Sequence, residues 1–486
     1  MSREDLRSEV PTISIAQDQN EKHLLLSVLR SRQLFVRSPI VVGYVSFNAG
    51  DTFSSAALKM KKLFSLYLLL ALSLAAVPQA QFAQEPAQAV DTTTRPVEKQ
   101  TKRVFEFSAD GVSFSNEFDG ARLNSVARLG DGQYTVTITP ENAPINPSPW
   151  YAFKVWAKNR KEISIRLVYP EGSRHRYDPQ LSTDGRKWKH LDRSFITEIE
   201  KGTGTSGPSS RPKSIVMRLQ IGRKPLWVSA QELTNSTSVF AWIAKTARKK
   251  KAAVEDIGRS IEGRPLRMLK FGDLDSKKNI LIISRQHPPE VTGYFAMQAF
   301  VDELLGGSKL SKQFRREYAI FVIPLMNPDG VDNGHWRHNM GGIDLNRDWT
   351  TFNQPEGRQV SEFLKKREAE TGGKFYFGID FHSTWNDIYY PMTPDNPGNM
   401  PNLVQDWLGS IKKALPGYEP NIQANNRLLP AIVSRNYFLA SHGMEAIVFE
   451  IGDNTPRDFI KKKGEVGAIE LMKLMLDRAK QTGTKP

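Results

Sequence analysis

The second half of the chain alternates short apolar runs with longer amphipathic stretches. The apolar runs are NILIISRQ, AIFVIPLM, FYFGIDFH and EAIVFEIG, and the stretches between or after them include TGYFAMQAFVDELL and VGAIELMKLMLDRAKQ. Continuous apolar runs are typical of strands buried on both faces, and their alternation with helices is typical of an α/β fold. We therefore expect residues 238–486 to form an α/β domain in which helices flank a mixed, largely parallel sheet.

Residues 104–232 have a different pattern. Short runs such as VFEFSA, QYTVTITP, YAFKVWAK and ISIRLVYP alternate apolar and polar residues and are separated by turn residues. Period-two alternation with frequent turns predicts an antiparallel β-sandwich. Four aromatic residues are expected in its core: Trp150, Tyr151, Phe153 and Trp156. This domain has no recognisable catalytic cluster.

The N-terminal region resembles an export signal that is preceded by extra residues. Residues 60–83 begin with a basic pair, continue with an apolar stretch and end in small and polar residues, as a secretory signal peptide does. The apolar stretch is shorter than the roughly 20 residues that cross a bilayer, so no permanent membrane span is expected. We expect export to the periplasm or beyond, a true start at Met60, a non-native or disordered segment 1–59 and a flexible leader 84–103. An uncleaved anchor behind a cytosolic tail is the alternative.

Composition limits the chemistry. The chain has no cysteine, which excludes disulfides, thiolate nucleophiles and cysteine-bound zinc. Its 67 Lys and Arg residues against 52 Asp and Glu residues give a net charge of +15. This charge favours acidic substrates or envelope polymers. The sequence carries no nucleic-acid-binding motif, so nucleic acid is not an expected partner.

Three side chains at the ends of expected strands are candidate metal ligands. His287 and Glu290 follow the strand NILIIS in the sequence HPPE, and His382 ends the strand FYFGIDFH. The carboxyl ends of parallel strands are where open α/β sheets bind ligands. Two histidines and one glutamate leave a fourth position for water, as in catalytic zinc sites. Asp380 is placed to orient His382, or to make a simple buried hydrogen bond.

Glu450 lies in the last apolar run, where a carboxylate is costly to bury without a purpose. Desolvation would raise its pKa toward the working range of a general base. Pairing with Arg457 is the alternative. Arg337, Asn346 and Arg347 lie in two polar segments, WRHN and DLNRDW, and suit a substrate that ends in a carboxylate. A solvated loop is their alternative reading.

The order of HPPE, NPDGV, WRHN, DLNRDW, NQPE, DFHS and FEIGD resembles the M14 family of zinc metallocarboxypeptidases. The stretches FSNEFDGARL and PSPWYAFKVWA look like the N-terminal domain of its cytosolic branch. The resemblance implies that His287, Glu290 and His382 bind one zinc ion. It also implies that Glu450 is the general base and acid in the hydrolysis of C-terminal peptide bonds.

The same resemblance implies that Arg337 polarises the scissile carbonyl, and that Asn346 and Arg347 bind the terminal carboxylate. The first motif carries prolines where many digestive members have an arginine. Tyr437 is the candidate for the family's mobile substrate-binding tyrosine. Arg435 is a candidate for the side-chain pocket, where it would favour an acidic C-terminal residue; a surface position is its alternative.

Three functions remain open from the sequence. They are an exported carboxypeptidase acting on peptides or proteins, a zinc peptidase or amidase acting on cell-wall peptides, and a noncatalytic zinc- or peptide-binding module. Glu450 argues against the third, since a binding protein needs no base beside an open metal site.

Overall fold

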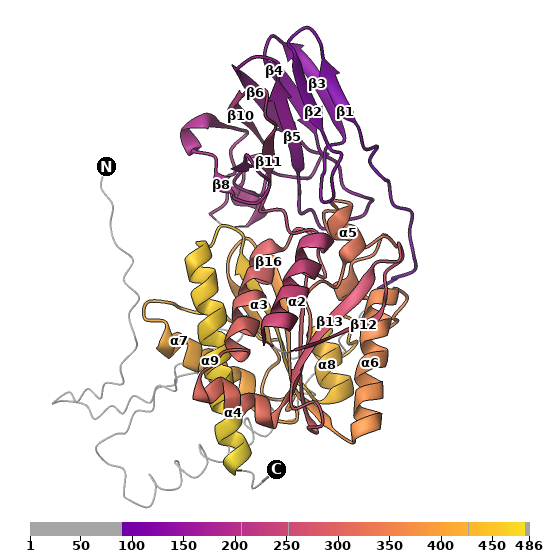
Figure 1. Cartoon of the computed structure of the whole chain (residues 1–486), viewed down its shortest axis with the longest axis vertical. Helices are drawn as coiled ribbons and strands as arrows, with labels where there is room; N and C mark the ends of the chain where they lie inside the picture. The colour runs from indigo at the N-terminus through magenta and orange to yellow at the C-terminus, as the bar shows by residue number, and fades with distance from the viewer. Residues whose placement is uncertain (1–89, 206, 251, 426, 482–486) are drawn as a thin grey trace, which may run out of the picture. The chain divides into compact units, whose positions relative to one another are not determined.

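The strands of the described chain form three sheets (Figure 1). The computed structural model describes residues 90–205, 207–250, 252–425 and 427–481. The predicted signal peptide 60–83 and the segment 1–59 before it lie outside these residues. Among the described residues, no helix combines the length and the apolar character that crossing a bilayer requires.

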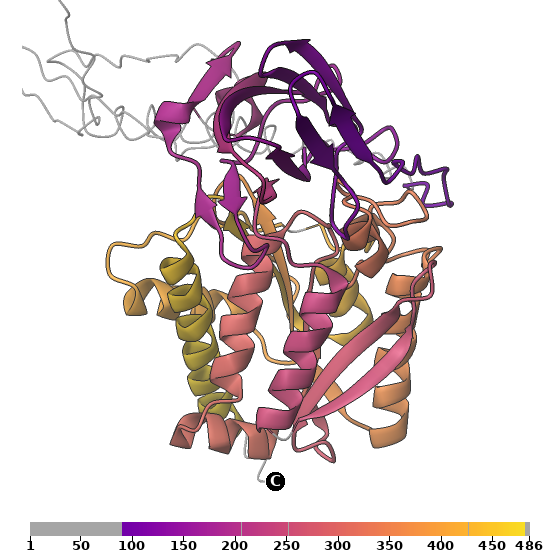
Figure 2. The same cartoon turned by 45° about the horizontal axis from the view of Figure 1, so that its top comes forward.

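The first domain consists of two sheets that pack on a common core (Figure 2). One sheet has the order β1-β2-β5-β11-β7-β8 and the other the order β3-β4-β6-β10-β9. All described pairings are antiparallel except that of β4 with β6. The elements are β1 Val104–Phe107, β2 Val112–Ser115, β3 Ser125–Gly130, β4 Gln133–Thr137, β5 Ala152–Ala157, β6 Lys161–Val168, β7 Gln180–Ser182, β8 Lys189–His190, η1 Arg193–Phe195, β9 Ile196–Ile199, η2 Pro208–Ser210, β10 Ser214–Ile221 and β11 Leu226–Ser229.

Three of the four predicted core aromatics are buried. Trp150, Tyr151 and Phe153 are at most 5% exposed, whereas Trp156 is only half-buried. Successive side chains of a strand point to opposite faces, so Trp156 lies on the face opposite to Phe153 and Val155. The predicted sheets are confirmed, and Trp156 is the exception in the predicted core.

The described part of the predicted flexible leader has no helix or strand, but it is fastened to the second domain. Thr92 is 1% exposed, and its carbonyl accepts a hydrogen bond from Gln354 Nε2 at 3.0 Å. The backbone N–H of Arg95 donates to the carbonyl of Gly341 at 2.7 Å. The described part of the leader is therefore held against the second domain, and the flexibility predicted for residues 84–103 stays a prediction.

The second domain is built on a seven-stranded mixed sheet with the order β12-β13-β15-β14-β16-β18-β17. Its centre is parallel, because β14 pairs in parallel with β15 and β16, and β16 pairs in parallel with β18. The elements are α2 Ser236–Lys250, β12 Ala253–Arg259, β13 Pro265–Gly272, β14 Lys278–Ser284, α3 Val291–Leu304, α4 Lys309–Glu317, β15 Ala319–Ile323, α5 Pro328–Asp332, η3 Leu345–Arg347, α6 Pro355–Thr371, β16 Lys374–Thr384, β17 Ile388–Pro391, α7 Leu403–Ala414, α8 Ser434–His442, β18 Glu445–Gly452 and α9 Arg457–Gln481.

Helices cover both faces of this sheet, as predicted (Figure 1). On β14, Ile280 and Ile282 pack into one core with α3, α7 and α9, and Leu281 and Ile283 pack into another with α6 and α8. Because both faces of the strand are buried, the run is continuously apolar. Figures 1 and 2 show α3 and α9 side by side on the first of these faces.

The two domains share part of their cores. Trp336 belongs to the second domain by sequence, yet it is fully buried in the core of the first and donates from Nε1 to the carbonyl of Trp150 at 3.1 Å. The carboxylate of Glu141, from the first domain, accepts hydrogen bonds from the backbone N–H groups of Trp336, Arg337 and His338 at 2.6 to 2.9 Å. The first domain therefore fixes the loop that carries Arg337.

Candidate functional site

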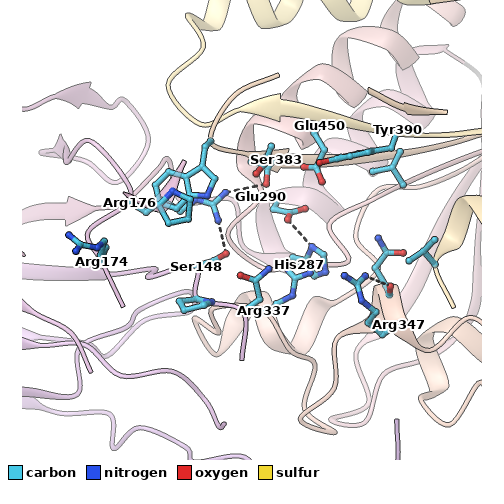
Figure 3. Close-up of a pocket in the computed structure, with 18 of the residues that line it drawn as sticks. Ser148, Arg174, Arg176, His287, Glu290, Arg337, Arg347, Ser383, Tyr390 and Glu450 are labelled. Atoms are coloured by element: carbon cyan, nitrogen blue, oxygen red, sulfur yellow. Dashed lines mark hydrogen bonds and ion pairs between the residues drawn. The ribbon is translucent and has the colours of Figure 1, made fainter. Parts of the chain in front are cut away.

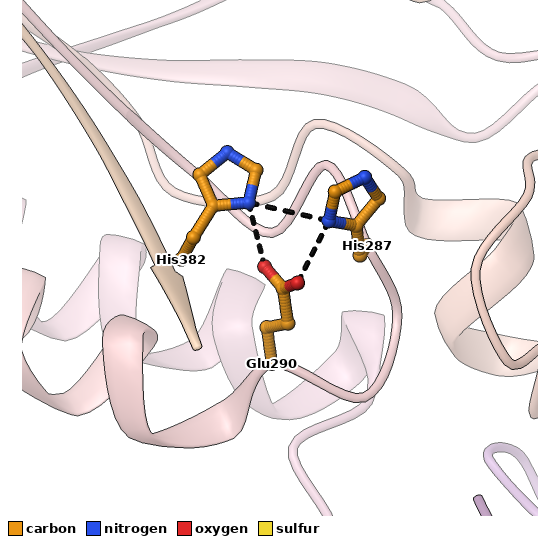
Figure 4. Close-up of side chains that lie close together, drawn as sticks. All are labelled: His287, Glu290 and His382. Atoms are coloured by element: carbon orange, nitrogen blue, oxygen red, sulfur yellow. Dashed lines mark hydrogen bonds and ion pairs between the residues drawn. The ribbon is translucent and has the colours of Figure 1, made fainter. Parts of the chain in front are cut away.

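His287, Glu290 and His382 converge at the carboxyl end of the parallel strands (Figure 4). His287 Nδ1 lies 2.7 Å from Glu290 Oε1, and His382 Nδ1 lies 2.8 Å from Glu290 Oε2. The two Nδ1 atoms are 3.2 Å apart. All three side chains are buried. The predicted ligand set is therefore brought together from a loop, a helix start and a strand end.

The local sequence explains how these groups come so close. HPPE makes a tight turn after β14, and Glu290 is the residue at which α3 begins. Gly293 lies in the first turn of α3, where a Cβ atom would be 2.3 Å from the carbonyl oxygen of His382. Only glycine permits this approach of backbone to backbone. The start of α3 can thus bring Glu290 against the end of β16.

The outer nitrogens of both imidazoles face carboxylates. His287 Nε2 lies 2.8 Å from Asp344 Oδ1, and His382 Nε2 lies 2.8 Å from Asp380 Oδ2. Carboxylates in these positions favour the tautomer that carries its proton on Nε2 and leaves a lone pair on Nδ1. The contact predicted between Asp380 and His382 is present.

Two imidazole lone pairs and a carboxylate therefore point at one another. Glu290 Oε2 is buried and makes no hydrogen bond among the described residues. Electron-pair donors packed so closely repel one another unless a cation lies between them. Two nitrogen ligands and one carboxylate oxygen with a free fourth position suit a catalytic zinc ion. The donor set thus fits a single zinc site.

Glu450 lies beside this site, on β18, in register with His382 on β16. Its Oε2 atom is buried and makes no hydrogen bond among the described residues. Burial raises the pKa of the Glu450 carboxyl to about 7, and the nearby charge of Glu290 adds to the effect. The alternative pairing with Arg457 is excluded, because Arg457 binds Glu232 at 2.8 Å. Glu450 is thus suited to accept and return a proton near neutral pH.

The metal cluster opens into a cleft of about 570 Å³ to which both domains contribute (Figure 3). Basic and hydrogen-bonding side chains dominate its lining. From the second domain these are His287, Glu290, Arg337, Asn346, Arg347, Trp385, Tyr390, Arg435 and Glu450, and from the first domain Ser148, Arg174 and Arg176.

The cleft includes the predicted substrate-binding residues Arg337, Asn346, Arg347 and Arg435. Arg337 Nε donates to Asp344 Oδ2 at 2.7 Å, which ties it to the carboxylate that contacts His287. Asn346 Oδ1 accepts from the backbone N–H of Ser434 at 2.9 Å. Hydrogen bonds to the rest of the protein therefore hold Arg337 and Asn346 in place, and the alternative of a solvated loop is excluded for them.

Arg435 is 7% exposed and donates from Nη1 to the carbonyl of Tyr390 at 2.9 Å. Burial lowers the pKa of its guanidinium to about 10. The surface position considered for it is therefore excluded. A buried cation with no acidic partner among the described residues is suited to bind an acidic group of a substrate.

The structure places Tyr437, the candidate substrate-binding tyrosine, outside the cleft. Its hydroxyl lies 2.7 Å from Ser361 Oγ and 3.2 Å from His442 Nε2, and its ring packs against Phe352 at 4.9 Å. It does not line the cleft. Residues two positions apart on a helix point about 200° apart, so α8 cannot direct both Arg435 and Tyr437 to the same side.

Two groups of cleft residues were not predicted from the sequence. Tyr390 lines the cleft from β17. Neighbouring residues of a strand point to opposite faces, so the pair Tyr389 and Tyr390 could have indicated that one tyrosine is buried and the other accessible. Ser148, Arg174 and Arg176 come from loops of a domain in which we expected no functional cluster. The basic segment around residue 175 was their one visible feature.

Comparison with known proteins agrees with this geometry. The peptidase M14 family, described as zinc carboxypeptidase, matches residues 239–413. Human cytosolic carboxypeptidase 6 is 32% identical over 55% of this chain and 56% of its own length, and the mouse protein of that name is 24% identical over 56% and 54%. The chain therefore spans about half the length of these curated relatives.

Solved structures share the fold over both domains. A metallo-carboxypeptidase from Burkholderia cenocepacia aligns with a TM-score of 0.60 at 18% identity, covering 76% of this chain and 99% of that one. A metallo-carboxypeptidase from Pseudomonas aeruginosa aligns with a TM-score of 0.58 at 19% identity, covering 75% and 99%. These shares exceed what the second domain alone supplies. From the family match, the ordered motifs and the assembled metal cluster, we conclude that residues 239–413 form part of a domain of the M14 zinc carboxypeptidase family.

Proposed function

We propose that this protein is a zinc-dependent carboxypeptidase that hydrolyses the C-terminal peptide bond of peptides or proteins. One observation carries the proposal: the metal cluster opens into the same cleft that Glu450, Asn346 and Arg347 line. A peptide whose terminal carboxylate met Arg347 would have its last peptide bond near the metal site. A noncatalytic module does not need this combination.

The residues of the metal cluster and Glu450 have separate roles in the proposed reaction. His287, Glu290 and His382 would hold the zinc ion, which when bound acidifies water and polarises a carbonyl. Glu450 takes the proton from the attacking water and returns it to the departing amine.

On the substrate side, Arg337 donates hydrogen bonds to the carbonyl oxygen as negative charge develops there. Asn346 and Arg347 hold the terminal carboxylate, for which a guanidinium offers two parallel N–H donors.

We further propose a preference for acidic C-terminal residues. Five arginines line the cleft, namely Arg174, Arg176, Arg337, Arg347 and Arg435, whereas both lining carboxylates, Glu290 and Glu450, are assigned to the metal and the proton transfer. Arg176 and Arg337 are already paired with Asp453 and Asp344. Arg435 supports the preference most directly, because it is buried without an acidic partner in the described contacts.

The test is to incubate the purified protein with peptides that differ only in a C-terminal Glu, Leu or Lys, and with cell-wall peptides, and to identify products by mass spectrometry. We expect single-residue release that is fastest from the Glu peptide, stops on chelation and returns with zinc. Cleavage of wall peptides alone would favour the cell-wall enzyme, and metal binding without any product would favour a binding module.

Export remains part of the proposal and rests on the character of residues 60–83. Expression of the full reading frame followed by cell fractionation and N-terminal sequencing tests it. We expect a mature protein that begins after residue 80 in the exported fraction. An intact N-terminus in the cytosol would contradict it.

A further inference from the structure

Arg176 extends from the first domain to the strand ends that carry the active site (Figure 3). Its Nε and Nη2 atoms donate to the two carboxylate oxygens of Asp453 at 2.7 and 3.2 Å. Nη2 also donates to the backbone carbonyl of Ser383 at 3.2 Å, and Nη1 donates to Ser148 Oγ at 2.6 Å. We call these four residues the Arg176 bridge.

The Arg176 bridge is buried. Arg176 and Ser148 are each 4% exposed, Asp453 is 1% exposed and Ser383 is 2% exposed. The guanidinium also packs over the ring of Trp385, with its carbon 4.9 Å from the ring centroid. A buried, bidentate ion pair that is satisfied by further hydrogen bonds has one favoured geometry, so it can fix the position of the segments that it joins.

Those segments are the immediate continuations of the catalytic strands. Ser383 follows His382 on β16, and Asp453 comes three residues after Glu450 at the end of β18. The backbone N–H of Asp453 donates to the carbonyl of Thr384 at 2.8 Å, which joins the two strand ends. One guanidinium from the first domain therefore contacts both.

The contacts continue to the third metal ligand. Ser383 Oγ accepts hydrogen bonds from Thr292 Oγ1 and from the backbone N–H of Gly293, both at 2.8 Å. These residues form the first turn of α3, which begins at Glu290. The Arg176 bridge is thus linked to the segments that hold His382, Glu290 and the carboxylate of Glu450.

We propose that Arg176 is a positioning residue for the reaction, and that the first domain is for this reason an obligatory part of the active site. The proposal rests on the proposed carboxypeptidase function. Arg176 acts through Ser383 and Asp453 by holding His382 and Glu450 in the geometry that the reaction needs. Displacements of about 1 Å at a reacting centre can cost on the order of 100-fold in rate.

The central experiment separates positioning from folding. Arg176→Met leaves Asp453 buried without its partner, which destabilises the fold by itself. The double variant Arg176→Met with Asp453→Asn removes both charges and relieves that defect. We expect the double variant to recover most of the thermal stability, while kcat stays about 100-fold below the wild-type value and KM changes little.

The matched control is Arg457→Met. Arg457 also forms a bidentate ion pair between the domains, with Glu232 at 2.8 and 2.9 Å. It reaches the Arg176 bridge through a 3.4 Å hydrogen bond to the backbone carbonyl of Asp453, and it does not line the cleft. We expect it to lower thermal stability and leave kcat unchanged. Arg176→Lys keeps the charge opposite Asp453 but loses the planar fork, so it should fold and show an intermediate kcat.

Three kinetic results would overturn the proposal. Recovery of kcat together with stability in the double variant would make Arg176 a folding residue only. A rise in KM with unchanged kcat would make it a substrate contact. If Arg457→Met lost as much kcat as the double variant, the loss would come from weaker docking of the two domains in general and not from the Arg176 bridge.

Zinc affinity gives a readout that does not depend on activity. Groups that orient metal ligands typically contribute 10- to 100-fold to affinity, and we expect the double variant to lose about tenfold in a chelator competition assay. If the wild-type protein releases no C-terminal residue, the proposed function fails, and this measurement still tests the Arg176 bridge. Unchanged zinc affinity in the folded double variant would then overturn it.

Discussion

The two walls of the cleft differ in what they supply. The wall from the second domain carries two of the three metal ligands, His287 and Glu290, together with Glu450 and the arginines assigned to the substrate. The wall from the first domain carries no acid or base in the cleft, but it contributes Ser148, Arg174 and Arg176 from loops. The comparison suggests that one domain supplies reacting groups and the other supplies their position.

We call the wall from the second domain the reacting wall and the wall from the first domain the positioning wall. The sharpest test of the reacting wall is Glu450→Gln. This change keeps the shape of the side chain but removes the base, so we expect kcat to fall about 1,000-fold while zinc content is unchanged. Glu445→Gln, on the same strand but bonded to Gly398, is the control and should retain activity. Turnover that survived in the Glu450 variant would assign the base to another residue.

Asp380→Asn tests how the reacting wall holds its metal. Asp380 Oδ2 lies 2.8 Å from His382 Nε2, and an amide is a poorer partner for an imidazole N–H than a carboxylate. We expect zinc affinity to fall by about 10- to 100-fold, measured by competition with a chromogenic chelator. Unchanged affinity would mean that the imidazole is oriented by its packing alone.

Arg435→Gln tests the substrate pocket of the same wall. Hydrogen bonds to a charged group contribute about 1.5–3 kcal/mol, so kcat/KM for a peptide that ends in Glu should fall about 10- to 100-fold. The value for a peptide that ends in Leu should change little. An equal loss for both peptides would remove Arg435 from the selection of the side chain.

The smallest expected effect concerns the positioning wall. Ser148→Ala removes one acceptor of Arg176 and leaves its three hydrogen bonds to Asp453 and Ser383. A net contribution of about 1 kcal/mol per hydrogen bond predicts a roughly fivefold fall in kcat at unchanged KM. A loss of activity in Ser148→Ala that exceeds the loss in Arg435→Gln would contradict the division of roles between the two walls.

The sequence predicted the metal cluster well for a physical reason. Parallel strands end at one edge of a sheet, so polar residues that follow apolar runs must meet there, and His287, His382 and Glu450 do. The parallel centre of the sheet and the helices on both of its faces followed from the same runs, whereas β12, β13 and β17 were not predicted.

Side-chain direction on short elements was harder to predict. Tyr437 lies outside the cleft because it is two positions from Arg435 on α8, and a step of two positions turns a side chain to the opposite side of the helix. The contact of Arg176 with the strand ends could not be predicted, because no local sequence pattern shows that a loop of one domain reaches the strand ends of another. Such contacts are decided by tertiary packing.

The burial of Trp336 has a practical consequence for protein engineering. The linker between Ser229 and Ser236 looks like a place to cut the chain. A fragment that started there would expose to water an indole that the intact protein covers completely, beside the loop of Arg337 and without the carboxylate of Glu141. Truncation should therefore give an aggregation-prone fragment. In a chimera that exchanges the first domain, the new domain needs an apolar site that covers Trp336.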